Sequence, residues 1–76
     1  MNVKVLGGGC SKCETLLANT KEAVANAGVD ADVEYITDFA VIGSYGIMSM
    51  PALVVDEKVV SMGKVLNSSE IEEFLK

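Results

Sequence analysis

The chain has 76 residues, of which 50% are hydrophobic and 22% are charged. This composition is typical of one small globular domain, here residues 1–76, and excludes an intrinsically disordered segment. Six lysines against eleven Asp and Glu residues give a net charge of −5, which argues against a nucleic acid as partner. The chain has no His, which removes the commonest general acid–base catalyst and the commonest metal ligand.

The distribution of apolar residues argues against a membrane partner. No apolar run reaches the roughly 18 residues that cross a bilayer, and the N-terminal residues 1–5 lack the long apolar stretch of a signal peptide. We therefore expect a cytoplasmic protein. Nothing in the sequence demands an oligomer, so we expect a monomer.

The first half of the chain predicts a strand, a helix and a second strand. Residues 3–6 are a short apolar run that Gly7-Gly8-Gly9 ends, and residues 31–36 contain the second such run. Between them, from residue 10 or 11 to about Ala27, apolar positions recur at helical spacing, and Gly28 follows as a C-terminal stop. These positions are Cys13, Leu16, Leu17, Thr20, Val24 and Ala27. Such a βαβ unit is expected to have parallel strands and a right-handed crossover.

The second half predicts a short helix, a hairpin and a last helix. Thr37 or Asp38 can cap the short helix, which begins near Phe39 and which Gly43 and Gly46 end. Pro51 then opens a strand over residues 52–55, followed by a tight turn at 56–58 and a strand over 59–62.

Two capping signatures precede the last helix. Either Asn67 with Glu70, or Ser69 with Glu72, has the spacing of a capping box. The apolar face of this helix is predicted to comprise Ile71, Phe74 and Leu75. The predicted order of elements is therefore βαβαββα.

The residues that carry chemistry are the two cysteines, Cys10 and Cys13, which lie where the first strand gives way to the helix. Two cysteines at this spacing in a cytosolic context indicate thiol redox chemistry or metal binding. The positive end of a helix favours a thiolate at Cys10 and lowers its pKa, and Lys12 can add positive charge. Cys13 lies one turn further along, on the face of Leu16, and we expect it to be more buried.

This placement predicts a disulfide-exchange mechanism. The Cys10 thiolate attacks a substrate disulfide, and Cys13 then resolves the mixed disulfide and leaves a Cys10–Cys13 disulfide. An external electron donor, a reductase or a low-molecular-weight thiol, must reduce this bond, and no further cofactor is expected. Gly9, Ser11 and Lys12 are the candidates for tuning the redox properties of the pair.

Two other readings of the cysteine pair stay open. The same thiolates suit Cu(I) in a metal-binding or metal-transfer module, with Met48, Met50 and Met62 as possible thioether ligands. Methionines that fill gaps beside a substrate groove are the more common arrangement. The third reading is an inert or regulatory interaction domain. We expect no metal site.

Three features together resemble a known family. These are the βαβαββα order, the segment Gly9-Cys10-Ser11-Lys12-Cys13 at the start of a helix, and a proline that opens the third strand. They resemble the thioredoxin fold in its minimal, glutaredoxin-like form, and more closely the small thioredoxin-like redox-active disulfide proteins of bacteria and archaea. The matching segments are residues 9–13, 45–55 and 59–63.

This resemblance has implications for both fold and site. It implies an α/β fold with a four-stranded mixed sheet in the order 2-1-3-4, flanked by helices, in which the third strand is antiparallel to the first. It implies that Pro51 is cis and packs beside the cysteine pair, and that the Met50 backbone binds an extended substrate segment. Dependence on glutathione does not follow from the resemblance, because Ser11 and Lys12 stand where glutaredoxins have Pro-Tyr.

Overall fold

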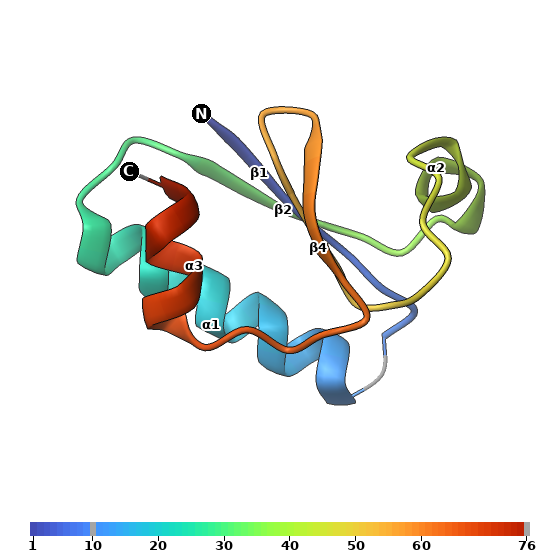
Figure 1. The fold of residues 1–76 in the computed structure, drawn as a ribbon, viewed down its shortest axis with the longest axis horizontal. Helices are drawn as coiled ribbons and strands as arrows, with labels where there is room; N and C mark the ends of the chain where they lie inside the picture. The colour runs from blue at the N-terminus through green and yellow to red at the C-terminus, as the bar shows by residue number, and fades with distance from the viewer. Residues whose placement is uncertain (10, 76) are drawn as a thin grey trace.

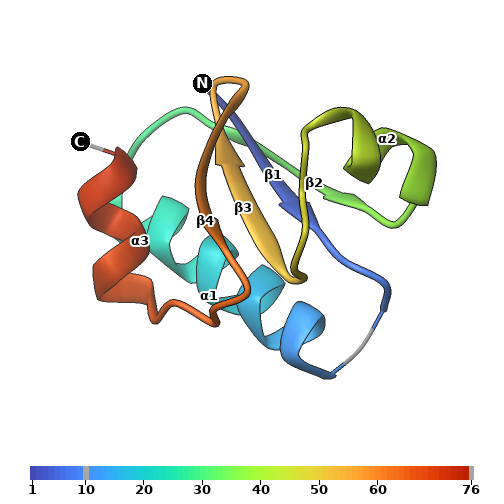
Figure 2. The ribbon, with the colours of Figure 1, turned by 45° about the vertical axis from the view of Figure 1, so that its right-hand side comes forward.

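The computed structural model describes residues 1–9 and 11–75 of the chain. The elements follow in the predicted order and form a sheet with helices on both faces (Figures 1 and 2). They are β1 (Asn2–Leu6), α1 (Ser11–Ala27), β2 (Asp32–Ile36), α2 (Phe39–Ser44), β3 (Ala52–Val55), β4 (Lys58–Met62) and α3 (Ser68–Leu75). Two predicted bounds were wrong: α2 continues through Gly43 to Ser44, and Lys58 belongs to β4 rather than to the turn.

The four strands form one mixed sheet in the order β2-β1-β3-β4. The strand β1 is parallel to β2 and antiparallel to β3, and β3 is antiparallel to β4. These findings confirm the predicted fold class and strand order. Because successive side chains of a strand point to opposite faces, the central strand β1 contributes to both hydrophobic layers. Val5 is buried in the layer beneath α1, and Leu6 is buried in the layer beneath α2.

Helix α1 buries one stripe of side chains against the sheet. The buried residues Cys13, Leu16, Thr20 and Ala23 recur at a spacing of three or four, as in any amphipathic helix. Ala23, which the helical spacing did not single out, is fully buried, and the predicted Val24 beside it is half-buried against the same core. The hydroxyl of Thr20 donates a 2.7 Å hydrogen bond to the Leu16 carbonyl, so its burial leaves no unsatisfied polar group on that side chain.

Helix α3 packs against α1 on the same face of the sheet (Figure 2). Asn67 and Glu70 form the reciprocal capping box: the Glu70 N–H donates to Asn67 Oδ1 at 2.8 Å, and the Asn67 N–H donates to Glu70 Oε1 at 3.3 Å. Ile71 and Leu75 are buried, as predicted. The prediction for Phe74 was wrong, because its side chain is 41% exposed.

The turn between β3 and β4 has both central residues in the left-handed region, with φ of 49° at Asp56 and 68° at Glu57. This is the backbone of a type I′ hairpin, whose twist matches that of the flanking strands. The N–H of Asn2 donates to Asp56 Oδ1 at 3.0 Å, and the Asp56 N–H donates to the Asn2 carbonyl at 2.8 Å. The start of β1 is therefore tied to this turn.

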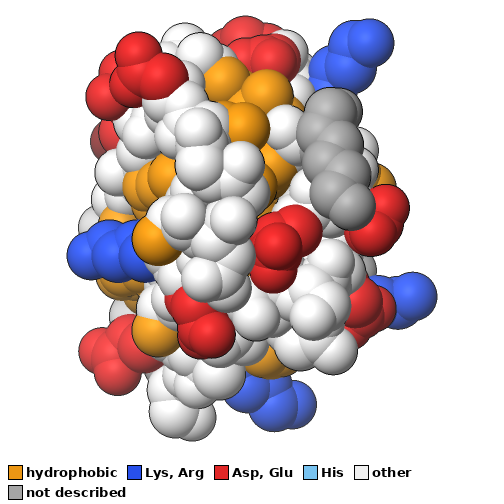
Figure 3. All heavy atoms as spheres, turned by 90° about the vertical axis from the view of Figure 1, so that its left-hand side faces the viewer, with side chains coloured by type: hydrophobic (Ala, Val, Ile, Leu, Met, Phe, Trp, Pro, Cys, Tyr) orange, Lys and Arg blue, Asp and Glu red, His pale blue; other side chains and the backbone are white. Residues whose placement is uncertain are grey.

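The acidic side chains do not gather in one patch on the face shown in Figure 3, where they are spread among hydrophobic side chains. This distribution is typical of a solvated surface.

None of the helices within residues 1–9 and 11–75 combines the length and the apolar character that a membrane-spanning helix requires.

Candidate functional site

The predicted nucleophile, Cys10, lies outside the described residues. Its predicted partner, Cys13, lies in the first turn of α1 and is 0% exposed. Ser11 and Lys12, on the same turn, are exposed. Cys13 therefore lies at the boundary between the core and the loop that connects β1 to α1.

The three glycines of this loop serve different purposes. Gly9 has a φ of +83°, a conformation that residues with side chains rarely adopt, and a Cβ added there would meet nothing within 4 Å. Gly7 has an ordinary backbone conformation, but a Cβ added there would lie 2.5 Å from Cys13 Sγ and 2.7 Å from Cys13 Cβ. Position 9 therefore favours glycine because of its positive φ, and position 7 favours glycine because Cys13 leaves no room for a side chain. Gly7 was not predicted as a site residue, because a run of glycines does not show which of them faces a neighbour.

Pro51 directly precedes β3, the strand that neighbours β1, and lies opposite the start of this loop. In the β1–β3 register Leu6 pairs with Ala52, so Gly7 and Pro51 come next along the two strands. Pro51 is buried and the Met50–Pro51 peptide bond is cis. The Pro51 carbonyl accepts a 2.9 Å hydrogen bond from the Gly63 N–H just beyond β4. Gly7 thus packs against Cys13 and lies opposite Pro51 in the sheet.

Exposed apolar side chains adjoin the same end of the sheet. A Cβ on Gly8 would lie 3.5 Å from the Phe39 ring and 3.8 Å from Met50 Cε, so both side chains lie beside the loop. Phe39 is 65% exposed and Met50 is 42% exposed. Met62, which pairs with Ala52 across the hairpin, is 43% exposed. We call Phe39, Met50 and Met62 the apolar rim. Phe39 was predicted only as a residue of the short helix and not as part of a site.

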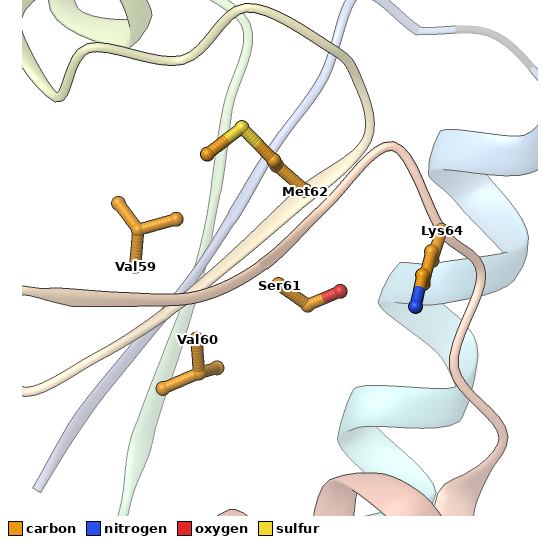
Figure 4. Close-up of a pocket in the computed structure, with 5 residues that line it drawn as sticks. All are labelled: Val59, Val60, Ser61, Met62 and Lys64. Atoms are coloured by element: carbon orange, nitrogen blue, oxygen red, sulfur yellow. The ribbon is translucent and has the colours of Figure 1, made fainter.

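A shallow groove of about 310 Å³ runs along β4 (Figure 4). The register changes from Leu53–Ser61 to Val54–Val59, so Val60 is the extra residue of a bulge. As a result, Val59 and Met62 lie on one side of β4 in Figure 4, and Val60 and Ser61 lie on the other. Among the described residues that the sequence predicts for a site, only Met62, considered as a thioether ligand, lines this groove.

A polar network lies on the face of the sheet that α2 covers, and it involves the segment that leads to Pro51. Lys4 Nζ donates to Glu57 Oε1 at 2.6 Å and to the Tyr45 hydroxyl at 2.9 Å, and that hydroxyl donates to Glu57 Oε2 at 2.9 Å. The hydrogen bond to Glu57, and then that to Tyr45, raises the pKa of Lys4. The hydrogen bond from Lys4, and then that from Tyr45, lowers the pKa of Glu57.

Tyr45 belongs both to the core and to this network. Its side chain is half-buried against the cluster that contains Leu6 and Ile42, and its hydroxyl lies between two charged groups. Tyr45 follows α2 directly, at its C-cap. The network therefore fixes the start of the connection from α2 to β3.

Within the described part of the chain, no three side chains of His, Cys, Asp or Glu are grouped so that they could hold a metal ion. The methionines considered as thioether ligands lie on the surface: Met48 is 90% exposed, and Met50 and Met62 are in the apolar rim. No observation favours the metal-binding reading.

Comparison with known proteins defines the family. The family model described as "Thioredoxin domain" matches residues 1–76. A thioredoxin of Methanothermobacter thermautotrophicus is 36% identical over 75 residues, which are 99% of this chain and 97% of that protein. A thioredoxin of Methanocaldococcus jannaschii is 34% identical over 74 residues, which are 97% of this chain and 85% of that protein.

These matches place the chain in a family of thiol–disulfide oxidoreductases. The chain belongs to the thioredoxin family, as the resemblance in its sequence implied.

Proposed function

We propose that the chain exchanges electrons with disulfide substrates through a Cys10–Cys13 dithiol, with Cys10 as the nucleophile and Cys13 as the resolving thiol. The observation that carries this assignment is the full burial of Cys13 in the first turn of α1. A thiol without exposed surface cannot meet a bulky substrate directly, but it can attack a sulfur that is brought to it. The outer position then belongs to Cys10, the residue before α1 in the sequence.

The start of α1 supports the choice of nucleophile. An α-helix of 17 residues carries a partial positive charge at its N-terminus, where N–H groups lack intrahelical partners. A thiolate is stabilised at such a position, and its pKa falls. In the first step the Cys10 thiolate bonds to one substrate sulfur, and the other substrate sulfur leaves as a thiolate that takes a proton from water.

The second step returns the substrate in reduced form. The Cys13 thiolate attacks the Cys10 sulfur, the bond between Cys10 and the substrate breaks, and the substrate leaves with two electrons gained in total. The product is a Cys10–Cys13 disulfide. A reductase or a low-molecular-weight thiol supplies two electrons to restore the dithiol, so no resident cofactor is needed.

The apolar rim supports a disulfide-bridged protein or peptide as substrate. Phe39 and Met50 leave apolar surface uncovered beside the loop that precedes α1, and Met62 adds exposed apolar surface on β4. Burial of such surface favours association. Met50 lies next to Pro51, where its backbone can pair with an extended substrate segment. We place the chain in the cytoplasm, where thiols are kept reduced. We expect it to act there as a monomer.

The first test counts the thiolates released when the reduced chain meets dithiobis(nitrobenzoate), an aromatic disulfide whose product is coloured. The proposal predicts two equivalents from the natural chain and one from Cys13→Ala, with the adduct on Cys10 by mass spectrometry. Cys10→Ser should react slowly, because only the buried Cys13 remains. Rapid reaction of Cys10→Ser, or one equivalent from the natural chain, contradicts the assigned roles.

The second test addresses the apolar rim. Phe39→Ala should slow reduction of a disulfide peptide with flanking leucines about tenfold, which corresponds to about 1.4 kcal/mol of lost apolar contact. Reduction of the same peptide with flanking serines should change little. Phe74→Ala is the matched control, because Phe74 is the other Phe of the chain and lies on α3, against the opposite face of the sheet. Equal losses with both peptides contradict a role for the rim.

A further inference from the structure

Gly7 is the residue against which the resolving thiol packs. It directly follows β1, and its N–H donates a 3.0 Å hydrogen bond to the Ile36 carbonyl, so it extends the pairing of β1 with β2. Pro51 comes opposite it along β3. Gly7 is therefore buried between Ile36, to which it is hydrogen-bonded, and Pro51 on its other side in the sheet.

The space around Gly7 cannot accept a side chain while Cys13 keeps its place. An added Cβ would lie 2.5 Å from Cys13 Sγ, a contact that rotation of the Cys13 side chain could relieve. It would also lie 2.7 Å from Cys13 Cβ. The position of a Cβ is set by its own backbone and does not change with rotation about χ1. Only a shift of the backbone can relieve this second contact.

The first turn of α1 is the part that must shift. Residue 7 is fixed by its hydrogen bond to Ile36, whereas the turn begins at Ser11, just after a loop that contains Gly8 and Gly9. Residue 7 also has little room to move toward Tyr35, because Tyr35 Cε1 lies 3.7 Å from the same added Cβ. Any side chain at position 7 therefore pushes Cys13 away from the end of β1.

We propose that Gly7 is a positioning residue for Cys13: the side chain it lacks lets the first turn of α1 approach β1 closely enough for the resolving thiol to reach its target. This inference rests on the proposed function. The step concerned is ring closure, in which the Cys13 thiolate bonds to the Cys10 sulfur and the substrate leaves as a thiolate. The preceding attack by Cys10 on the substrate does not involve Cys13.

The test separates the two steps in time. Under stopped flow, reduced protein and dithiobis(nitrobenzoate) should release one equivalent of coloured thiolate on attack by Cys10 and the second on ring closure. Gly7→Ala should slow the second phase by about 10-fold to 100-fold, since a displacement near 1 Å has effects of that size on a positioned reaction. The first phase should stay within about threefold, and mass spectrometry of quenched samples should show the mixed disulfide on Cys10.

Gly8→Ala is the matched control for the second phase. It makes the same chemical change one residue along the loop, but its added Cβ would meet only ordinary contacts of 3.5 Å or more. Ring closure in this variant should proceed at the natural rate. If Gly7→Ala unfolds in buffer, the comparison is made in trimethylamine oxide, which favours compact states.

The outcomes distinguish this inference from the proposed function. If the natural chain releases fewer than two equivalents, the proposed function fails first. If it releases two, and Gly7→Ala closes the ring at the natural rate, Gly7 has no positioning role. Equal slowing by Gly8→Ala, or a Gly7→Ala variant that stays unfolded in the osmolyte, also overturns the inference, because it requires a local shift within an intact fold.

Discussion

Replacing Asn67 by Ala should lower the stability of the protein by about 1 kcal/mol. The Asn67 side chain accepts the Glu70 N–H at 2.8 Å and is the cap of α3. Loss of such a cap typically costs about 1 kcal/mol. For 76 residues the entropy of unfolding is about 0.16 kcal/mol/K, so this loss corresponds to a fall of about 6 °C in Tm.

The assay is thermal unfolding of the reduced protein, followed by circular dichroism, with Ser69→Ala as the control. Ser69 belongs to the alternative capping signature, but it lies inside α3. Because Ala favours a helix interior more than Ser does, Ser69→Ala should be neutral or slightly stabilising. A fall in Tm for Ser69→Ala together with an unchanged Tm for Asn67→Ala would refute the assignment of the cap.

Two further predictions concern buried and charged groups. Cys13→Ser should be less stable than Cys13→Ala by about 1 kcal/mol in urea unfolding. The reason is that serine places a hydroxyl at a buried position where a weakly polar thiol packs. Equal stabilities of the two variants would show that water reaches the site. Glu57→Gln should destabilise the protein at neutral pH, because the lowered pKa of Glu57 favours the folded state above the ordinary pKa of 4.5. This difference should shrink as the pH falls below 4.5 and through the lower folded pKa, whereas a difference that grows on acidification would contradict the network with Lys4.

Local signals predicted most of the elements. Asp38 caps α2 by accepting the Ala40 N–H at 2.9 Å, and the Asn67–Glu70 pair caps α3, because capping depends on residues close in sequence. The strand order needed the resemblance to a family, since periodicity does not show which strands pair. Phe74 fits the helical spacing of a buried residue, but the width of the buried stripe depends on what α3 packs against.

The site was predictable where chemistry depends on spacing. Cys10 and Cys13 stand out by their separation and by the helix that follows them. Gly7 does not, because its contact with Cys13 depends on how closely α1 approaches the end of β1. The Lys4–Glu57 pair joins residues 53 positions apart, and only the register of β1 with β3 brings them together.

The most direct test of the account is the pH dependence of Cys10 alkylation in Cys13→Ala. A small iodoacetamide reagent reports the thiolate fraction, and mass spectrometry confirms the residue modified. We expect a titration midpoint clearly below the ~8.5 of an ordinary thiol, because Cys10 precedes the positive end of α1. A midpoint at the ordinary value, or no modification of Cys10, would contradict its role as an activated nucleophile.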